Sequence, residues 1–497
     1  MSRSPEAQAQ AVLRRRIVGL ALPICGAVVV GAGAQSVIAA LLGHMGDDAL
    51  YVRSVFIPVA FLVLALQEGL DISTQVGFAR LRGARQAGRT RSTLVTFVRV
   101  GLLVLAVTAL AVAVAAPWLA SLLGVPSARS AQFVEFARWT ALASVLTVPT
   151  TIAAAALRGW GRPGLSAVLS VLVATVQVSG VWLVGEVAGL GVMSVPVATA
   201  ASAAVGATVA LWLVLRTGLV RTVRPGDGPG GQAAGQSVGR AAGQAAARAE
   251  TAGGAPGPDV DVRRLLVGIG VPVGLSYLLL TVMNFVTVWI LSPSGSSVVA
   301  GYGAAAAVQT VLVVPAIGLA AAVGVVMNQQ WGTGDLGLLP RTLRVGTRIA
   351  VSVYLGVGLV AFLTAAQVAR LMAADPVVAE QTELYLRVVG PSLAGLGTVL
   401  FLLTLLEQLG HGRVAVGLNL AYAVLSLGVG GVLARQGGGH EALYLVVACS
   451  NLLGVVVVLP LAFRLVRRTS TRTPAVAGTT ADAEGDLDQT IDSGADR

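Results

Sequence analysis

The stretch Leu265–Gly334 reads LLVGIGVPVGLSYLLLTVMNFVTVWILSPSGSSVVAGYGAAAAVQTVLVVPAIGLAAAVGVVMNQQWGTG and contains no Asp, Glu, Lys or Arg. A transmembrane helix needs about 20 apolar residues, so this stretch can supply two spans. The segment Leu291–Ser297 (LSPSGSS) places a turn between them, because Pro and Gly break helices and Ser tolerates water. The stretch therefore predicts an all-α integral membrane protein.

The rest of the 497-residue chain has the same character. It is 55% hydrophobic and only 11% charged, against roughly 25% in soluble domains. All basic residues are Arg and lie in loops between apolar segments, so the net charge of +11 does not indicate nucleic acid binding. Cys25 and Cys449 lie within apolar segments, and we expect neither a disulfide nor a metal site.

Hydropathy and turn residues predict twelve spans. With a cytoplasmic N-terminus, 28 of the 34 Arg fall on the cytoplasmic side, which predicts that both termini are cytoplasmic in the plasma membrane. The predicted spans are Ile17–Leu42, Tyr51–Val76, Thr93–Ala116, Gln132–Leu157, Gly164–Val184, Gly191–Leu215, Leu265–Leu291, Val299–Val326, Thr347–Ala369, Glu383–Leu406, Val414–Ala434 and Ala442–Phe463.

The first six spans repeat in the last six. An offset of 249 residues maps Pro23 onto Pro272 and Gly83 onto Gly332, and aligns other Gly, Leu and Arg positions as well. Because six is an even number, both halves enter the membrane from the same side. This predicts two pseudo-symmetric six-helix lobes, related by an axis along the membrane normal, with a site between them.

Five segments follow from this reading. Residues 1–16 form a cytoplasmic N-terminus, 17–215 an N-lobe and 265–468 a C-lobe. Residues 216–264 are rich in Gly, Ala, Gln and Arg and have too few apolar residues to bury, so we expect a disordered cytoplasmic linker. Residues 469–497 are acidic and predict a disordered tail.

The second span alone carries acids well inside its apolar length. Glu68, Asp71 and Gln75 share one helix face. A charged Asp near the bilayer centre costs about 2.5–3.5 kcal/mol on insertion scales, so such residues usually face a cavity or a partner. Two carboxylates one turn apart titrate as a unit, which suits them to ion coupling. The alternative is structural, with Asp71 held by nearby Arg80 or Arg82.

Other polar residues inside spans are weaker candidates. We expect cavity-lining roles for Gln67, Thr74, Gln75, Gln35, Asn284 and Gln309, although such groups more often join helices. Pro23 and Pro272 are hinge candidates, because Pro removes a helix hydrogen bond. Glu407, at the end of the tenth span, is expected in headgroup water.

Three motifs resemble the multidrug and toxic compound extrusion (MATE) family. They are Leu42-Gly43-His44-Met45-Gly46 after span one, Asn328–Asp335 (NQQWGTGD) after span eight, and Leu157–Pro163 (LRGWGRP) after span four, which repeats at Leu406–Arg413. The resemblance implies two lobes that form a V with a central cavity. It also implies export of small amphipathic or cationic compounds in exchange for H⁺ or Na⁺.

The sequence departs from this family at its ion-coupling positions. Ile38 stands where many members carry Asp, and Thr175 and Ser179 replace an Asn-x-x-x-Asp pair. Span seven has no acid. The family's coupling residues therefore do not transfer to this chain, and Glu68 and Asp71 remain the candidates.

Two other functions compete with export. A flippase for lipid-linked precursors would need cationic side chains for pyrophosphate, and no Arg lies deep within a predicted span. A membrane enzyme is disfavoured because HExxH, GxSxG and Walker A motifs are absent from the sequence. We expect a monomer in the lipid bilayer with a small-molecule substrate and no cofactor except the coupling ion.

Overall fold

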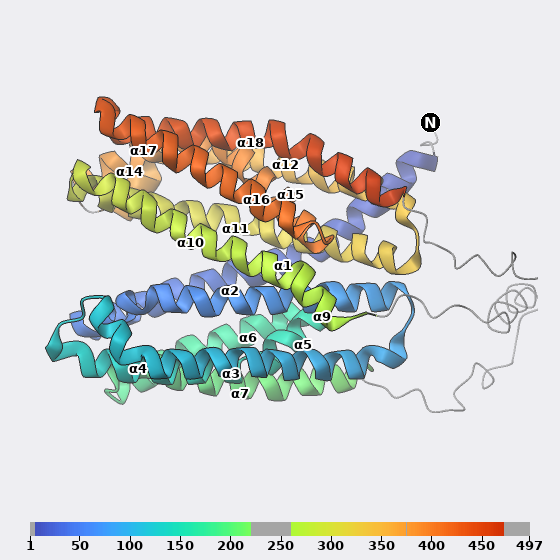
Figure 1. Cartoon of the computed structure of the whole chain (residues 1–497), viewed down its shortest axis with the longest axis horizontal. Coiled ribbons are helices and arrows are strands. Elements are labelled where there is room, and N and C mark those ends of the chain that lie inside the picture. Colours follow the sequence, from blue (N-terminus) through green and yellow to red (C-terminus); the bar gives the residue numbers. More distant parts are fainter. Residues whose placement is uncertain (1–4, 220–259, 374, 472–497) are drawn as a thin grey trace, which may run out of the picture.

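The computed structural model describes residues 5–219, 260–373 and 375–471 (Figure 1). Within these ranges the regular structure is helical and no strand occurs. Ten of the described helices are long and apolar enough to cross a membrane, and a pair bent by 41° adds an eleventh span. The longest, Gly412–Ser470, holds two spans, because its backbone is not helical at Gln436 and Gly437. The predicted twelve spans are therefore confirmed.

The N-lobe holds the first six spans. Its long elements are α1 (Pro5–His44), α2 (Asp47–Gly83), α3 (Thr90–Leu122), the bent pair α4 (Ser127–Leu146) and α5 (Val148–Gly159), α6 (Pro163–Val181) and α7 (Ser194–Arg216). Short turns join them at η1 (Ala87–Arg89), η2 (Trp182–Val187) and η3 (Gly191–Met193).

The C-lobe holds the other six. Its elements are α9 (Val262–Leu265), η4 (Leu266–Gly270), α10 (Val271–Leu291), η5 (Ser292–Ser294), α11 (Ser296–Thr333), η6 (Leu336–Leu338), α12 (Leu339–Leu363), α13 (Ala365–Met372), α14 (Pro376–Val389), η7 (Gly390–Ser392), α15 (Leu393–Gln408), α16 (Gly412–Ala423), η8 (Val424–Val429), α17 (Gly430–Leu433), η9 (Ala434–Gly438) and α18 (Gly439–Ser470). The predicted turn after Leu291 is present at η5, where Gly295 has φ 106°. The ninth predicted span is interrupted at Thr364, between α12 and α13.

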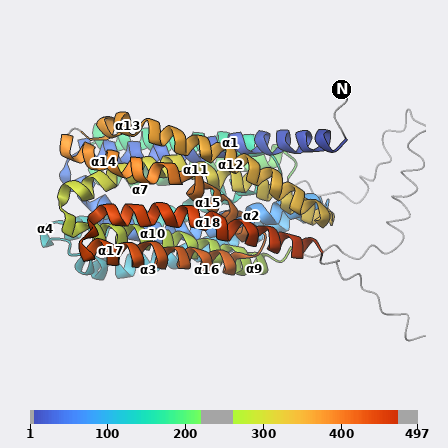
Figure 2. The same cartoon turned by 90° about the horizontal axis from the view of Figure 1, so that it is seen from above.

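The two lobes lie side by side with their long helices along the longest axis of the molecule (Figures 1 and 2). The described chain begins and ends at the same end of the bundle, which we call the terminal side. This arrangement follows from an even number of spans in each half. Of the predicted linker and tail, residues 220–259 and 472–497 lie outside the described residues.

In each lobe, the first part of the first helix packs in the core of the other lobe. Ile17, Ala21 and Ile24 of α1 pack in a core cluster built from α11, α12, α15 and α18. Leu265 and Ile269, from the start of the C-lobe, pack reciprocally in a cluster built from α2, α3, α5 and α7. The exchange ties the lobes together on the terminal side.

A pair of glycines marks the symmetry between the lobes. A Cβ on Gly83 would lie 2.1 Å from the carbonyl oxygen of Gln329, and one on Gly332 would lie 2.3 Å from that of Arg80. The 249-residue offset exchanges both pairs, so this is one contact made twice with the roles reversed. A two-fold axis produces such a contact. Only glycine permits so close an approach of the two backbones.

Candidate functional site

A cavity of about 240 Å³ lies inside the N-lobe, between α1, α2, α5 and α6. Its polar lining includes Gln35, Asp71, Arg158 and Gln177. Asp71 is one of the two acids that the sequence analysis selected. The cavity can therefore bring water or a small solute to a carboxylate inside the membrane-spanning part of the chain.

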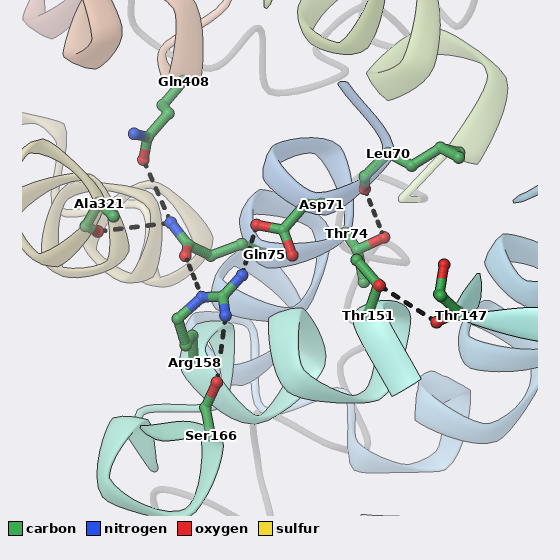
Figure 3. A network of polar contacts seen from close by, with 10 residues as sticks. All are labelled: Leu70, Asp71, Thr74, Gln75, Thr147, Thr151, Arg158, Ser166, Ala321 and Gln408. Atoms are coloured by element: carbon green, nitrogen blue, oxygen red, sulfur yellow. Dashed lines mark hydrogen bonds and ion pairs between the residues drawn. The ribbon is translucent and has the colours of Figure 1, made fainter. Parts of the chain in front are cut away.

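Asp71 forms an ion pair with Arg158 of α5 (Figure 3). The two side chains are 16% and 15% exposed. Arg158 also donates from Nε to Gln75 Oε1 at 3.0 Å and from Nη1 to Ser166 Oγ at 3.1 Å. Four residues from α2, α5 and α6 thus form one polar network, in which each of the three guanidinium nitrogens donates one hydrogen bond.

The alternative partners predicted for Asp71 are wrong. Arg80 donates to Asn328 Oδ1 at 2.9 Å and lies over the Trp331 ring, so it points into the other lobe. Arg82 donates to the carbonyl oxygen of Trp160. No Arg lies deep within a predicted span of the sequence, yet the side chain of Arg158, which directly follows the fourth predicted span, reaches from the last turn of α5 to the cavity.

Gln75 connects this network to the C-lobe. Its Nε2 lies 3.4 Å from the carbonyl oxygen of Ala321 and 3.4 Å from Gln408 Oε1 (Figure 3). Arg16 adds a second polar contact between lobes, with 2.6 Å from Nη2 to Gln329 Oε1. These contacts all fall on the terminal side. The lobes are therefore closed against each other there by both glycine packing and hydrogen bonds.

Glu68 takes a different direction from Asp71. Its carboxyl group lies near the hydroxyl of Tyr277 on α10, and Tyr277 packs against the N-lobe core. The sequence placed Glu68, Asp71 and Gln75 on one helix face. The structure divides them, since Asp71 and Gln75 meet Arg158 and Glu68 meets the C-lobe.

Glu407 corrects another expectation. The sequence placed it in headgroup water, but it is 4% exposed and accepts a hydrogen bond of 2.6 Å from Ser276 Oγ. Asn419 donates to the same hydroxyl at 3.1 Å. Sequence reasoning missed Arg158, Tyr277 and Glu407 as functional candidates. One signal was present, because the 249-residue offset pairs Arg158 with Glu407 and so reverses the charge at equivalent positions.

The remaining N-lobe candidates are divided between cavity and core. Gln35 lines the N-lobe cavity, and its Oε1 accepts from Arg53 at 3.2 Å. Gln67 donates to Thr147 Oγ1 at 3.0 Å. Thr74 is fully buried and bonds the carbonyl oxygen of Leu70, so it contacts its own helix rather than open space (Figure 3).

The C-lobe candidates lie apart from this network. Asn284 accepts from Tyr302 at 3.4 Å, and Gln309 accepts from Tyr385 at 2.7 Å. Both belong to an aromatic cluster toward the end opposite the terminal side. Among the described residues no group of three or more His, Cys, Asp or Glu is placed to hold a metal ion.

Both prolines lie inside continuous helices. Pro23 lies inside α1, and Pro272 is the second residue of α10, which continues α9 and η4 in one helix from Val262 to Ser294. A Cβ on Gly412 would lie 2.4 Å from Pro272 Cβ, so the second proline is packed against the α15–α16 turn.

Comparison with known proteins bears on the repeat. The family model described as MatE matches residues 23–183 and again residues 272–432. The two matches are separated by the same 249 residues that the sequence analysis found, which confirms the repeat. No curated protein matches this sequence.

Solved structures with this fold are numerous. The Vibrio cholerae MATE transporter VcmN, as a point mutant, superimposes with a TM-score of 0.81 at 18% identity, over 93% of this chain and 98% of that one. VcmN in the bent form gives 0.79 at 18% identity, over 93% and 99%. A MOP superfamily transporter from Pyrococcus furiosus, whose binding pocket is described as having reverse polarity, gives 0.77 at 18% identity, over 92% and 96%. These likenesses establish the two-lobed architecture.

Proposed function

The chain belongs to the MatE family of membrane transporters, and from that premise we propose that it is a secondary active exporter. It would move small amphipathic or cationic organic compounds out of the cell in exchange for H⁺ or Na⁺, by alternating access. We further propose that it acts as a monomer in the plasma membrane, catalyses no reaction, and has its terminal side in the cytoplasm. The last point rests on the 28 Arg that fall on that side.

One observation carries the coupling proposal: the Asp71–Arg158 pair lines a cavity and is one hydrogen bond away from the lobe interface. While Asp71 is ionised, it holds Arg158, which holds Gln75 toward Ala321 and Gln408. A proton or a Na⁺ ion on Asp71 weakens its attraction for Arg158 and so loosens Gln75. Ion binding then changes the balance between lobe arrangements, as an antiporter requires.

A flippase for lipid-linked pyrophosphates is the competing function. Arg158 in the N-lobe cavity is the observation that favours it, because guanidinium groups bind phosphate well. Asp71, however, neutralises this Arg and occupies its Nη2. A pyrophosphate would have to displace a carboxylate already in place, so we favour export.

The test is transport by the purified protein in liposomes. An imposed pH gradient or Na⁺ gradient should drive accumulation of the fluorescent cation ethidium or another compound from a panel of amphipathic cations. Asp71→Asn should abolish gradient-driven transport, and Glu68→Gln should abolish it or shift its pH dependence, with the fold kept in both. Asp48→Asn is the matched control, since Asp48 is 63% exposed and pairs with Arg129 at the protein surface.

Two results would overturn the proposal. Transport of no panel compound, combined with binding of lipid-linked pyrophosphate, would favour the flippase. Unchanged pH and Na⁺ responses in the double variant Asp71→Asn/Glu68→Gln, at normal protein levels, would place the coupling site elsewhere.

A further inference from the structure

Glu407 is a buried acid whose surroundings suit a neutral carboxyl group. It is 4% exposed, and it accepts a hydrogen bond from the neutral hydroxyl of Ser276. Burial opposes a charge on this carboxyl group, whereas the hydrogen bond from Ser276 favours it, and no described Arg forms an ion pair with Glu407 to add to that bond. An isolated carboxylate is costly to bury, and such a group usually takes up a proton instead. Asp71, by contrast, has an Arg as partner.

Every element around Glu407 supports this contrast. Helix α10 presents Ser276 and Tyr277, α16 presents Asn419, and α2 presents Glu68 with Asp71 farther along. Arg158 of α5 is held by Asp71, Gln75 and Ser166. Charged residues on the other neighbours of α15 lie outward: Arg344 and Arg348 on α12, Arg413 on α16 and Arg464 on α18 are all exposed. Two further basic groups lie near this end of the helix: His411, which follows α15 and is half-buried, and Arg80 of α2, which donates to Asn328 Oδ1 while Asn328 Nδ2 donates to the carbonyl oxygen of Gln408.

The acid also lies where the lobes meet. Tyr277 of α10 lies near both Glu407 and Glu68, so it stands between an acid of the C-lobe and an acid of the N-lobe. Gln408, the residue after Glu407, receives the 3.4 Å contact from Gln75 of the N-lobe. Separation of the lobes on this side would remove both neighbours and open the environment of Glu407 to water.

A cavity lies next to the side chain that contacts Glu407. A space of about 160 Å³ lies inside the C-lobe between α10, α15, α16 and α18. Ser276 and Asn419 line it, and these are the two residues that connect to Glu407. Glu407 itself does not line the cavity, so Ser276 separates its carboxyl from this space, and Tyr422, Ser450 and Asn451 add further polar groups to a mostly apolar lining.

We propose that Glu407 is a second proton-binding residue, located in the C-lobe, which holds its proton while the lobes are closed on the terminal side and releases it when they separate. The inference rests on the proposed exporter function and adds to it a proton site that is independent of Asp71. Closing of the lobes then takes up one proton at Glu407. Low pH favours the closed form, and rising pH favours separation, because the ionised carboxylate is tolerated only in the open form.

The test follows lobe separation directly and needs no substrate. Spin labels at Gly88→Cys and Gly337→Cys report it, because these exposed repeat mates lie on the terminal side of opposite lobes and a Cβ there meets nothing within 4 Å. Cys25 and Cys449 are replaced by Ser. In liposomes, one proton taken up on closing changes the open-to-closed ratio by up to about tenfold per pH unit. Glu407→Gln removes this proton from the closing step. The open-to-closed ratio should therefore lose this contribution of up to about tenfold per pH unit, and the lobes should stay closed to higher pH.

Two control variants isolate the effect. Glu383→Gln removes an acid near the opposite end of the same span, where it pairs with Arg387 at the protein surface, and should retain the full slope. His411→Gln should also retain it. A slope that is the same in Glu407→Gln as in the wild type overturns the inference, as does a wild type that does not respond to pH.

Infrared spectroscopy gives a second measurement that does not need the Glu407→Gln variant. In Glu68→Gln/Asp71→Asn, the absorption band of a protonated carboxyl should persist at neutral pH in the closed form, and it should fade as the pH rises. Absence of the band in this variant overturns the proposal for Glu407. The transport assay tests the exporter function independently of Glu407, because the expected loss of transport in that assay depends on Asp71.

Discussion

The two lobes share a backbone plan and differ in their charges. At one pair of equivalent positions the N-lobe has Arg158 and the C-lobe has Glu407. Arg158 meets Asp71 within its own lobe, but the equivalent of Asp71 in the C-lobe is Ala320. The C-lobe acid therefore cannot form the ion pair that its repeat mate forms in the N-lobe, and it turns to Ser276.

The difference shows which features the repeat constrains. The contacts of Gly83 and Gly332 survive in both halves because they lie on the axis, where a side chain on either residue would separate the lobes. Polar side chains away from the axis have no such constraint. One lobe can then carry an ion pair in a cavity, while the other carries a single buried acid.

Loss of Arg158 should have the largest effect on stability. Arg158→Ala leaves the half-buried Asp71 without its partner, and because water in the cavity can reach Asp71, the cost should be below the roughly 3–5 kcal/mol of a fully buried pair but above that of a surface pair. Thermal unfolding in detergent should show the loss, and the double variant Arg158→Ala/Asp71→Asn should recover most of it. Arg129→Ala, which breaks the exposed pair with Asp48, should cost less than about 1 kcal/mol. Equal losses from the two arginine variants would remove the distinction between cavity pair and surface pair.

Methyl groups added at the two-fold axis should have the second-largest effect. They should destabilise the closed form equally from either lobe. Gly83→Ala and Gly332→Ala each push a Cβ into a carbonyl oxygen of the other lobe, and overpacking of this kind costs about 1–3 kcal/mol. The closed form should lose population by the same factor in both variants, as measured with the spin labels at residues 88 and 337. The controls are Gly19→Ala and Gly268→Ala, repeat mates with open space around them. A response to only one axial variant would contradict the two-fold contact.

The smallest effect is expected from Glu407→Gln. If the carboxyl is neutral in the closed form, an amide of the same shape replaces it with a change in unfolding free energy within about 1 kcal/mol. Thermal unfolding at neutral pH measures this value beside that of Arg158→Ala. A loss as large as that of Arg158→Ala would mean that Glu407 is ionised in the fold, and the contrast between the lobes would then be wrong.

Much of the architecture could be predicted because its causes are local in the sequence. A membrane span is recognised by about 20 consecutive apolar residues, and a turn is recognised by Pro and Gly. A duplicated lobe is recognised by residues that recur at one sequence offset. The same reasoning found Glu68 and Asp71, because an acid inside an apolar span is conspicuous wherever the helix packs. Motifs at the ends of spans one, four, eight and ten pointed to the family that the repeated model match then established.

The pairing of these acids was decided only by the tertiary structure. Arg80 and Arg82 are closer to Asp71 in sequence, yet Arg158 reaches it because the bent α4–α5 span packs α5 against α2. Glu407 looked exposed because it ends a span, but α10 covers that end and buries it. Hydropathy reports what a residue is, whereas solvation depends on which helices lie beside it. The contact of Asp71 with Arg158 joins residues that are 87 positions apart in the sequence, and the contact of Ser276 with Glu407 joins residues that are 131 positions apart. No local sequence pattern predicts such contacts.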